Sequence, residues 1–495
     1  MKDLVAVRIF VVTFLAAGVA VLPAWAGQTV RVQVEPEVRH QVWQGFGEGG
    51  MDQFIPTWHE QYTQAQRDAW LDRMYTLEGN GLGLNICRFL MPVGDAPGHH
   101  HSFRLPKGAN RPFEPEPNEF NWQGHENILW HVQGAKQRGA LTWASWYAVP
   151  YWLTVSGCSA GSVDGATDNL VAGKEARFVQ HIVDVMEHFR SAWGVDFDYV
   201  SAINEPDADW WKAGGGQPGC HVSPEQAIVI YTELAKAMDS AGFRAKRIAF
   251  DAGYTNGTSY LDILLASPIV EDLSVLACHQ YITTDEALKG WASRAAEHKK
   301  DLWMTEWGDW ANDGYPHDRP HAQAMNYANK IHEAMTLLQA TGWVIWEPAF
   351  IIEEEPAGLL PRKSFWAVAQ YSRHVRPGMV RVGATTSTTS TAIKTTAWVS
   401  RADVADREFA VVMVNDGNTV VTAEIELPRL PGLVIDEIRR TGDADDYALI
   451  SVPVGSDTGL VRVTLPAGSI VTVAGSVVPG ASVARNAGAD VKVNP

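Results

Sequence analysis

The chain has little cysteine, little positive charge and few long apolar runs. Its 495 residues include 4 Cys, and 40 Lys and Arg stand against 57 Asp and Glu, which gives a formal net charge of −17 at pH 7. Neutralising phosphates requires a basic surface, so this charge argues against a nucleic-acid partner. After residue 26 no stretch reaches the roughly 18 uninterrupted apolar residues that a membrane-spanning helix needs. We therefore expect no membrane anchor in the mature chain.

The mostly apolar stretch at residues 9–22 lies at the very start of the chain. Lys2 and Arg8 give a charged beginning, and Ala24–Ala26 (AWA) supplies an A-x-A cleavage pattern before Gly27. This arrangement is typical of a secretory signal peptide and is too short and wrongly flanked for a spanning helix. We expect residues 1–26 to be removed and the mature protein to be secreted or periplasmic.

Four cysteines in an exported chain permit a disulfide. Cys87 and Cys278 lie inside apolar strand patterns and are expected to be small buried residues. Cys158 and Cys220 lie in loops rich in Gly and Ser, so they are the better candidate pair. No spacing of Cys and His resembles a zinc site. We expect neither a metal nor a cofactor.

Between residue 42 and about residue 346, short apolar runs alternate with amphipathic helical patterns. This alternation is typical of parallel βα units, and eight such units form a barrel. The fold class that we predict is α/β, a (β/α)8 TIM barrel. The eight predicted strands are Val42–Gly47, Leu82–Phe89, Leu141–Trp146, Tyr199–Asn204, Arg247–Asp251, Val275–Tyr281, Asp301–Thr305 and Gly342–Trp346.

After about residue 376 the composition changes to Thr, Val and Ser, with short alternating runs such as Phe409–Val414 and Leu460–Leu465. These features indicate a C-terminal antiparallel β-sandwich. Thr29–Val34 alternates in the same way and is expected to add a strand to it. The predicted domains are a signal peptide (1–26), an N-terminal strand pairing with the sandwich (27–41), the barrel (42–375), the sandwich (376–479) and a loose tail (480–495).

Two glutamates each follow an apolar run. Glu205 lies in Tyr199–Pro206 (YVSAINEP), and Glu306 lies in Asp301–Trp307 (DLWMTEW). The C-terminal ends of all barrel strands meet on one face, so the fourth and seventh strands would bring the two carboxyls together. Hydrolysis of a glycosidic bond needs such a pair. Either motif alone is compatible with a simple turn, but the two together indicate a glycoside hydrolase.

Four segments of the chain resemble glycoside hydrolase family 30. They are Gln44–Gly47 (QGFG), Asn204–Pro206 (NEP), Thr305–Trp307 (TEW) and Tyr371–Arg381 (YSRHVRPGMVR), which links the barrel to the sandwich. The resemblance covers essentially the whole mature chain. It implies a retaining mechanism with Glu205 as the acid/base and Glu306 as the nucleophile.

Within the family, Asn204–Trp211 (NEPDADWW) followed by Gly214–Cys220 (GGGQPGC) is similar to the endo-β-1,6-galactanase branch. Glu48 departs from the family pattern, because small or aromatic residues are commoner after Gly-Phe-Gly. The alternatives that remain are a β-1,6-glucanase, a xylanase, a β-glucosidase and a glucosylceramidase-like hydrolase with the same two glutamates. A catalytically inactive carbohydrate-binding protein is a remote alternative, because both glutamates and Asn204 are retained.

Residues at other strand ends are predicted to support the site or to bind substrate, and Arg88 is a candidate for both roles. Arg88 would keep Glu306 charged, although a structural ion pair is an equal alternative. Tyr281 would donate its hydroxyl to Glu306, and His279, on the same side of its strand, would bind a substrate hydroxyl. The resemblance implies that Asn204 bonds the 2-hydroxyl beside the reacting carbon, a contact that strengthens in the transition state.

Trp146 and Trp346 are candidate platforms for a sugar ring, since both close a predicted strand. Either is also compatible with the barrel core, because strand residues alternate between two faces. Trp346 is the better candidate. The expected partner is an oligo- or polysaccharide substrate, and we expect a monomer.

Overall fold

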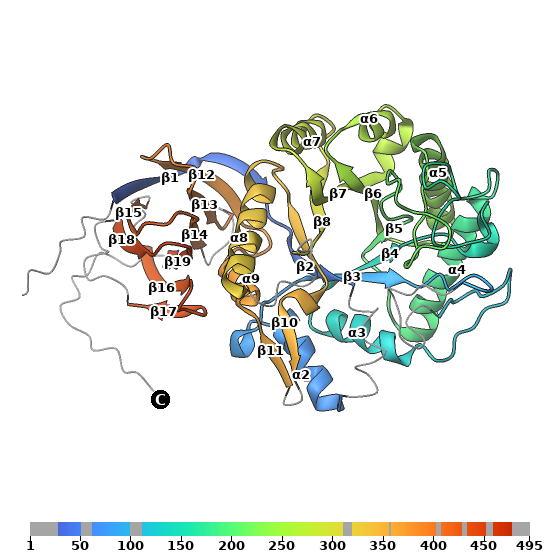
Figure 1. Cartoon of the computed structure of the whole chain (residues 1–495), viewed down its shortest axis with the longest axis horizontal. Helices are drawn as coiled ribbons and strands as arrows, with labels where there is room; N and C mark the ends of the chain where they lie inside the picture. The colour runs from blue at the N-terminus through green and yellow to red at the C-terminus, as the bar shows by residue number, and fades with distance from the viewer. Residues whose placement is uncertain are drawn as a thin grey trace, which may run out of the picture.

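The computed structural model describes residues 28–50, 62–99, 111–309, 319–355, 358–401, 407–427, 433–451 and 459–477. The predicted signal peptide and the predicted tail lie outside these residues. The described part forms two bodies, a barrel and a C-terminal sheet, which lie side by side (Figure 1). Among the described residues, no helix is long and apolar enough to cross a membrane.

Eight parallel strands close into a barrel, and each of the eight predicted strands is present. The last strand pairs with the first, so the sheet has no free edge. The predicted (β/α)8 fold is therefore confirmed. The strands are β2 (Gly45–Gly49), β3 (Ile86–Met91), β4 (Leu141–Trp146), β5 (Tyr199–Ser201), β6 (Lys246–Thr255), β7 (Leu273–Thr283), β8 (Asp301–Trp307) and β9 (Gly342–Trp346).

Helices cover the outside of the barrel and begin and end at residues suited to those places. Ser223 accepts a hydrogen bond from the backbone N–H of Gln226 and caps α5, as its Ser-Pro start predicts. Gly194, with a φ of 69°, ends α4 in the left-handed conformation that glycine tolerates best. The helices are α2 (Gln64–Tyr75), α3 (Glu126–Gln137), α4 (Glu175–Trp193), α5 (Pro224–Ser240), α6 (Ser259–Leu265), α7 (Asp285–Glu297), α8 (Pro320–Thr336) and α9 (Lys363–Ser372). The short 3-10 helices among the described residues are η2 (Glu78–Asn80), η4 (Tyr151–Leu153), η5 (Pro268–Asp272) and η6 (Pro348–Phe350).

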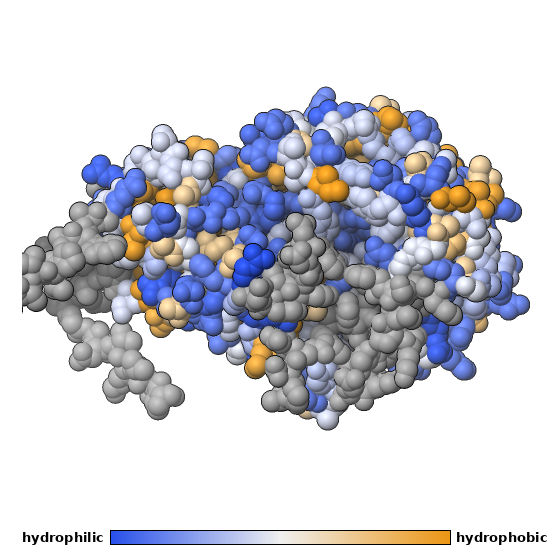
Figure 2. Space-filling model, viewed as in Figure 1, coloured by the Kyte–Doolittle hydropathy of each residue, from blue (hydrophilic) through white to orange (hydrophobic). Residues whose placement is uncertain are grey.

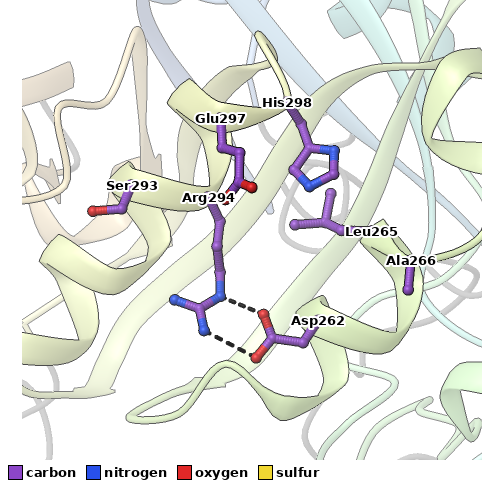
Figure 3. Close-up of a pocket in the computed structure, with 7 residues that line it drawn as sticks. All are labelled: Asp262, Leu265, Ala266, Ser293, Arg294, Glu297 and His298. Atoms are coloured by element: carbon purple, nitrogen blue, oxygen red, sulfur yellow. Dashed lines mark hydrogen bonds and ion pairs between the residues drawn. The ribbon is translucent and has the colours of Figure 1, made fainter.

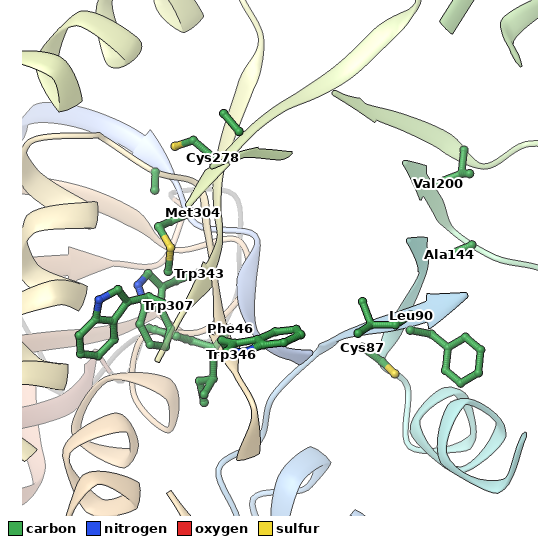
Figure 4. Packing of buried hydrophobic residues seen from close by; sticks show 14 of the residues in the cluster. Phe46, Cys87, Leu90, Ala144, Val200, Cys278, Met304, Trp307, Trp343 and Trp346 are labelled. Atoms are coloured by element: carbon green, nitrogen blue, oxygen red, sulfur yellow. The ribbon is translucent and has the colours of Figure 1, made fainter. Parts of the chain in front are cut away.

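Side chains on the barrel strands alternate between an inner and an outer core. The outward residues pack under the helices in one large cluster, and Figure 4 shows Phe46, Met304 and Trp343 from adjacent strands among its members. A separate inner cluster fills the barrel, with Trp143 and Trp303 in edge-to-face contact at 6.3 Å between ring centres. This inner cluster makes the barrel a packed core on whose C-terminal end the loops build a site.

The C-terminal body is a nine-stranded sheet in the order β17-β16-β19-β14-β13-β12-β1-β15-β18. All its neighbours are antiparallel except β1 and β15, which are parallel. Strands from the whole width of the sheet share one buried hydrophobic cluster, so the sheet wraps around its own core. Its strands are β1 (Gln28–Val42), β12 (Val380–Thr386), β13 (Ile393–Val399), β14 (Arg407–Asn415), β15 (Val421–Glu426), β16 (Leu433–Thr441), β17 (Ala448–Ile450), β18 (Leu460–Leu465) and β19 (Ser469–Val477). A separate hairpin, β10 (Ile352–Glu355) and β11 (Gly358–Pro361), precedes α9.

The two bodies share a buried junction. On β14, Phe409, Val411 and Met413 belong to the core of the sheet. The alternate residues Ala410 and Val412 belong to the cluster of the barrel. Helices α8 and α9 lie between the sheet and the barrel (Figure 1). The chain also enters the barrel from β1 and leaves it into β12, two strands that pair with each other. These links fix the sheet against the barrel.

Figure 2 shows how hydrophobic and hydrophilic residues of the described part are distributed on one face of the molecule. Hydrophobic residues appear there as small patches separated by hydrophilic ones. Isolated apolar side chains of this kind are usual on a protein surface.

Candidate active site

The two predicted glutamates meet at the C-terminal end of the barrel. Glu306 lies in β8, whereas β5 is shorter than predicted, so Glu205 follows it in a loop. The backbone N–H of Glu205 donates to the carbonyl of Asp251 at 2.9 Å, which ties this loop to β6. One oxygen of each glutamate lies within 4.8 Å of the other. Oxygens this close are compatible with the separation of about 5–5.5 Å between the carboxyl groups of retaining enzymes.

Arg88 holds Glu306 from inside the barrel. Its Nη1 donates to Glu306 Oε2 at 2.6 Å, and its Nη2 donates to Asp251 Oδ2 and to Asn204 Oδ1, also at 2.6 Å. The side chain is fully buried, so the prediction that Arg88 binds substrate is wrong. Arg88 instead orients Glu306 through their hydrogen-bonded ion pair.

Asn204 is fully buried and only half satisfied. Its Oδ1 accepts from Arg88, which fixes the orientation of the amide. Its Nδ2 has no hydrogen-bond partner among the described residues. A buried amide N–H₂ without a partner is costly unless a ligand accepts from it. This donor therefore has the chemistry needed to bind a sugar hydroxyl.

His279 lies between the carboxylates. Its Nδ1 is 2.7 Å from Glu205 Oε1, and its Nε2 is 3.2 Å from Asp251 Oδ1 and 3.5 Å from Glu306 Oε2. Burial by itself would lower the pKa of His279, but the three carboxylates raise it to about 10. The ring is fully buried, and both of its nitrogens already lie within hydrogen-bonding distance of carboxylates of the protein. The prediction that His279 binds a hydroxyl is wrong.

Asp251 is a site residue that the sequence reasoning missed. It is fully buried on β6 and accepts from Arg88, His279 and the hydroxyl of Thr305, the last at 2.5 Å. Burial by itself would raise the pKa of Asp251, but the charges of Arg88 and His279 lower it. Asp251 thus supplies a permanent negative charge beneath the two glutamates. Its place at the end of a predicted strand was the available signal.

The environment of Glu205 favours its protonated form. Burial raises the pKa of Glu205, and the charges of Glu306 and Asp251 raise it further, while His279 acts in the opposite direction. Burial likewise raises the pKa of the neighbouring Asp207 to about 6, although two backbone N–H groups donate to its carboxylate. A carboxyl that keeps its proton toward neutral pH is suited to act as a general acid.

A cleft of about 260 Å³ opens above the glutamates, and its walls are mainly aromatic. Tyr281 donates to Glu306 Oε1 at 3.3 Å, as predicted, and Tyr147 donates to Glu306 Oε2 at 3.4 Å. Trp346 lines the cleft, in the predicted position, and stacks on Tyr147 at 5.9 Å between ring centres. The residues that line the cleft are Tyr147, Glu205, Trp210, Trp211, Gln217, Tyr281, Glu306 and Trp346.

Trp146 lies outside the cleft, so its predicted role as a sugar platform is wrong. It is fully buried in the outer cluster beneath the helices, where its ring meets His181 of α4 edge-on. Along β4, Trp143 and Ser145 face the barrel interior, where both contact Arg88. The same alternation turns Trp146 outward and brings Tyr147, the next residue, into the cleft.

The predicted disulfide is not formed in the structure, in which Cys158 and Cys220 are free buried thiols. The two loops nevertheless lie side by side, since Gly219 N donates to Ser159 O at 2.9 Å. The Cys220 thiol packs in the large cluster of the barrel and donates to His221 O at 3.6 Å. Backbone hydrogen bonds and packing therefore hold these loops together without the bond.

A second buried group of metal-binding atom types lies between the barrel and its helices. Glu48, Cys87 and His131 bring ligand atoms within 4.8 Å of one another. Tyr75 and His131 both hydrogen-bond to the same carboxylate oxygen of Glu48. A metal-bound imidazole usually donates its other N–H to an outer partner, whereas His131 Nδ1 has none among the described residues. We interpret the group as a hydrogen-bonded network that accommodates the unusual Glu48.

Comparisons with known proteins agree with this geometry. A family model described as O-glycosyl hydrolase family 30 matches residues 29–263. The chain is similar to an endo-beta-1,6-galactanase of Hypocrea rufa, with 25% identity over 350 residues that cover 68% of each chain. It is also similar to a glucuronoxylanase of Bacillus subtilis (strain 168), with 25% identity over 423 residues that cover 83% of each chain. Among solved structures, the catalytic domain of a family 30 xylanase from Talaromyces cellulolyticus has a TM-score of 0.69 at 19% identity, covering 90% of this chain and 99% of that one. These matches confirm the resemblance found in the sequence.

Proposed function

Because the protein belongs to glycoside hydrolase family 30, we propose that it is an exported, retaining hydrolase. Its proposed substrate is a β-1,6-linked galactan, which it cleaves at internal bonds. The observation that carries the retaining mechanism is the short separation of the two glutamates, one held by a guanidinium and the other in surroundings that favour its proton. In this geometry one carboxylate reaches the sugar directly, without an intervening water.

The reaction has two steps. Glu306 attacks the anomeric carbon and forms a covalent glycosyl-enzyme, while Glu205 gives its proton to the departing oxygen. Glu205, now ionised, then takes a proton from water, whose oxygen attacks the same carbon and releases Glu306. Two displacements on the same carbon return the original configuration.

The surrounding donors prepare Glu306 for attack. Arg88, Tyr147 and Tyr281 all donate to its two oxygens, which orients the carboxylate before substrate arrives. The free N–H₂ of Asn204 is assigned to the hydroxyl next to the reacting carbon. That contact strengthens as positive charge develops on the sugar, so it lowers the barrier more than it tightens binding.

The substrate assignment rests on the galactanase relative and on the chemistry of the cleft. Among the described residues that line the cleft none is basic, and the guanidinium of Arg88 lies buried beneath it. These described residues therefore offer no cation that could pair with the carboxylate of a sugar. Aromatic walls suit the C–H faces of neutral sugar rings. We therefore favour a neutral galactan over glucuronoxylan.

The test is a panel of β-1,6-galactan, β-1,6-glucan, glucuronoxylan, a glucosylceramide and small aryl glycosides, assayed with purified mature protein. We expect fastest hydrolysis of β-1,6-galactan, with short oligosaccharides rather than only monosaccharides among the early products. Faster hydrolysis of another glycan would change the assigned substrate but not the assignment to the family. Binding without turnover on the whole panel would instead support a carbohydrate-binding protein.

Proton NMR of the first product tests the mechanism separately. We expect the β-anomer to appear first and the α-anomer to follow by mutarotation. An α-anomer as the first product would show inversion and contradict the proposed roles of the glutamates. Export is tested by N-terminal sequencing of the protein recovered outside the cytoplasm, for which we expect Gly27 as the first residue.

A further inference from the structure

Each oxygen of Glu205 has a different neighbour. Oε1 faces the buried ring of His279 at 2.7 Å, whereas Oε2 accepts from the indole Nε1 of Trp210 at 3.2 Å. His279 is fully buried, and Trp210 is 36% exposed. A glycosidic oxygen in the cleft therefore reaches Oε2 and not Oε1. The proton that Glu205 gives to the leaving group leaves from the oxygen beside Trp210.

Trp210 is held from behind while one side of it remains open. Its ring packs on Tyr254 at 4.8 Å between ring centres, and the Tyr254 hydroxyl donates to Asp209 Oδ1 at 2.5 Å. Gly253 allows this approach, since a side-chain carbon there would lie 2.9 Å from Trp210 Cζ2 and 3.1 Å from Glu205. The indole thus has a fixed place and an exposed edge in the cleft.

The next residue serves a different purpose. Trp211 is 3% exposed, and its Nε1 donates to the backbone carbonyl of Glu205 at 3.0 Å. Two consecutive indoles therefore donate hydrogen bonds to Glu205. Trp211 donates to its backbone carbonyl, and Trp210 donates to its carboxylate. Only Trp210 combines that contact with a surface that a substrate can reach.

We propose that Trp210 is a positioning residue on the leaving-group side of the bond, which orients the proton-bearing oxygen of Glu205 and provides a platform for the departing sugar. This inference rests on the proposed role of Glu205 as the acid. Tyr147, on which Trp346 stacks, donates to Glu306, the carboxylate to which one sugar becomes covalently attached in the proposed reaction. The aromatic residues of the cleft then divide between the two sides of the bond that is cut.

The two parts of this role are separable by mutation. Trp210→Phe keeps an aromatic ring but removes the N–H donor, whereas Trp210→Ala removes both. An N–H bond to a carboxylate favours its charged form, so losing the bond should raise the pKa of Glu205. The alkaline limb of the activity profile, where the acid loses its proton, should then move to higher pH by about half a unit in Trp210→Phe.

The platform is tested with two substrates of the wild-type enzyme, its preferred polysaccharide and the β-fluoride of the matching disaccharide. Fluoride leaves without a sugar on the far side of the bond and needs little protonation. In Trp210→Ala we expect KM for the polysaccharide to rise about tenfold. For the fluoride, kcat/KM should stay within about threefold of wild type.

Trp366→Phe on α9 is the matched control, since the Trp366 ring stacks on Tyr447 far from the cleft. This substitution should change neither the kinetic constants for the two substrates nor the pH profile. Equal losses on both substrates, with the alkaline limb of Trp210→Phe unchanged, would overturn the inference and leave Trp210 a structural residue. If Trp210→Ala fails to fold, two measurements on Trp210→Phe decide the question. They are its pH profile and the ratio of its kcat/KM values for the polysaccharide and the fluoride. A wild-type enzyme inactive on both substrates would instead refute the proposed function.

Discussion

Replacing Arg88 by lysine tests whether one guanidinium organises the whole site. The guanidinium makes three hydrogen bonds of 2.6 Å, to Glu306, Asp251 and Asn204, while fully buried. A lysine keeps the positive charge, but its single ammonium cannot reproduce a planar fork that reaches acceptors on β6, on β8 and in the loop after β5. At least one carboxylate must therefore lose its charged partner.

Both stability and activity should fall in Arg88→Lys. Leaving one member of a buried ion pair unpaired costs about 3–5 kcal/mol, and the retained charge of lysine places the expected loss near the lower value. Activity should fall by on the order of 10² in kcat, because Glu306 is no longer held in line with the anomeric carbon. Chemical denaturation at pH 7 and initial rates on the preferred polysaccharide provide the two measurements.

Acid unfolding gives a third readout of the same change. Arg88 and His279 hold the pKa of Asp251 below its usual value against the effect of burial. Such a carboxylate contributes stability that is present above its unfolded pKa of about 3.9 and is lost as pH falls through its folded pKa. Removing the guanidinium raises the folded pKa, so Arg88→Lys should begin to unfold at a higher pH than wild type.

Arg294→Lys is the matched control. Arg294 of α7 makes two hydrogen bonds to Asp262 of α6 in a surface pocket (Figure 3), but the two side chains are 31% and 46% exposed. An exposed pair of this kind contributes less than about 1 kcal/mol. We expect little loss of stability and normal activity. Equal effects of the two substitutions on stability and rate would refute the assignment of Arg88 as the centre of the site.

The other predictions concern the charges and thiols of the site. Glu306→Ala should be inactive on every substrate and give an α-glycosyl azide when azide is added. Glu205→Ala should retain activity on substrates with good leaving groups and give a β-glycosyl azide. If NMR identifies the reverse products, the roles of the two glutamates are exchanged. Because the pKa of His279 is raised to about 10, its contribution to stability is complete below about pH 6.5 and is lost between there and pH 10. The free energy of unfolding should fall across that window by at most about 1.4 kcal/mol per pH unit, and His279→Gln should flatten the curve. Cys158 and Cys220 should both be alkylated in denaturant without a reductant, and protection of this pair would show that the disulfide forms after all.

The positions of the two glutamates were predictable from the sequence because a barrel converts strand order into spatial proximity. The apolar runs before Glu205 and Glu306 locate two strand ends, and parallel strands bring all such ends to one face. The same logic placed Arg88 and Tyr281 near Glu306. Strand-end position is therefore the signal that carries most of the site.

The inward or outward direction of a residue was not predictable for strands that are buried on both sides. Trp143, Trp146 and Tyr147 lie on one short stretch, and all of them are apolar enough for either face. Alternation fixes only that Trp143 and Tyr147 face one way and Trp146 the other. Which way is inward depends on the closure of the barrel, and this is why Trp146 was wrongly assigned.

Asp251 ends a predicted strand, but its backbone conformation is an irregularity that the sequence pattern does not predict. The pairing of β6 with β7 shifts register between Ala249 and Ala252, and Asp251 has a φ of 58°. This break in the regular pattern accompanies a carboxylate placed under the site. A sequence pattern predicts the regular strand but not where it departs from regularity.

Charge balance links these buried groups to the proposed reaction. With Glu205 protonated, the positive charges of Arg88 and His279 match the negative charges of Glu306 and Asp251. In the covalent intermediate Glu306 loses its charge to the glycosyl ester while Glu205 becomes ionised, so the total is again zero. An unpaired charge in such a buried site is unfavourable in free energy. When the negative charge moves from Glu306 to Glu205, it comes to lie 2.7 Å from His279. A neutral histidine would leave both states with a net charge of −1, so this balance favours a protonated His279 in both of them.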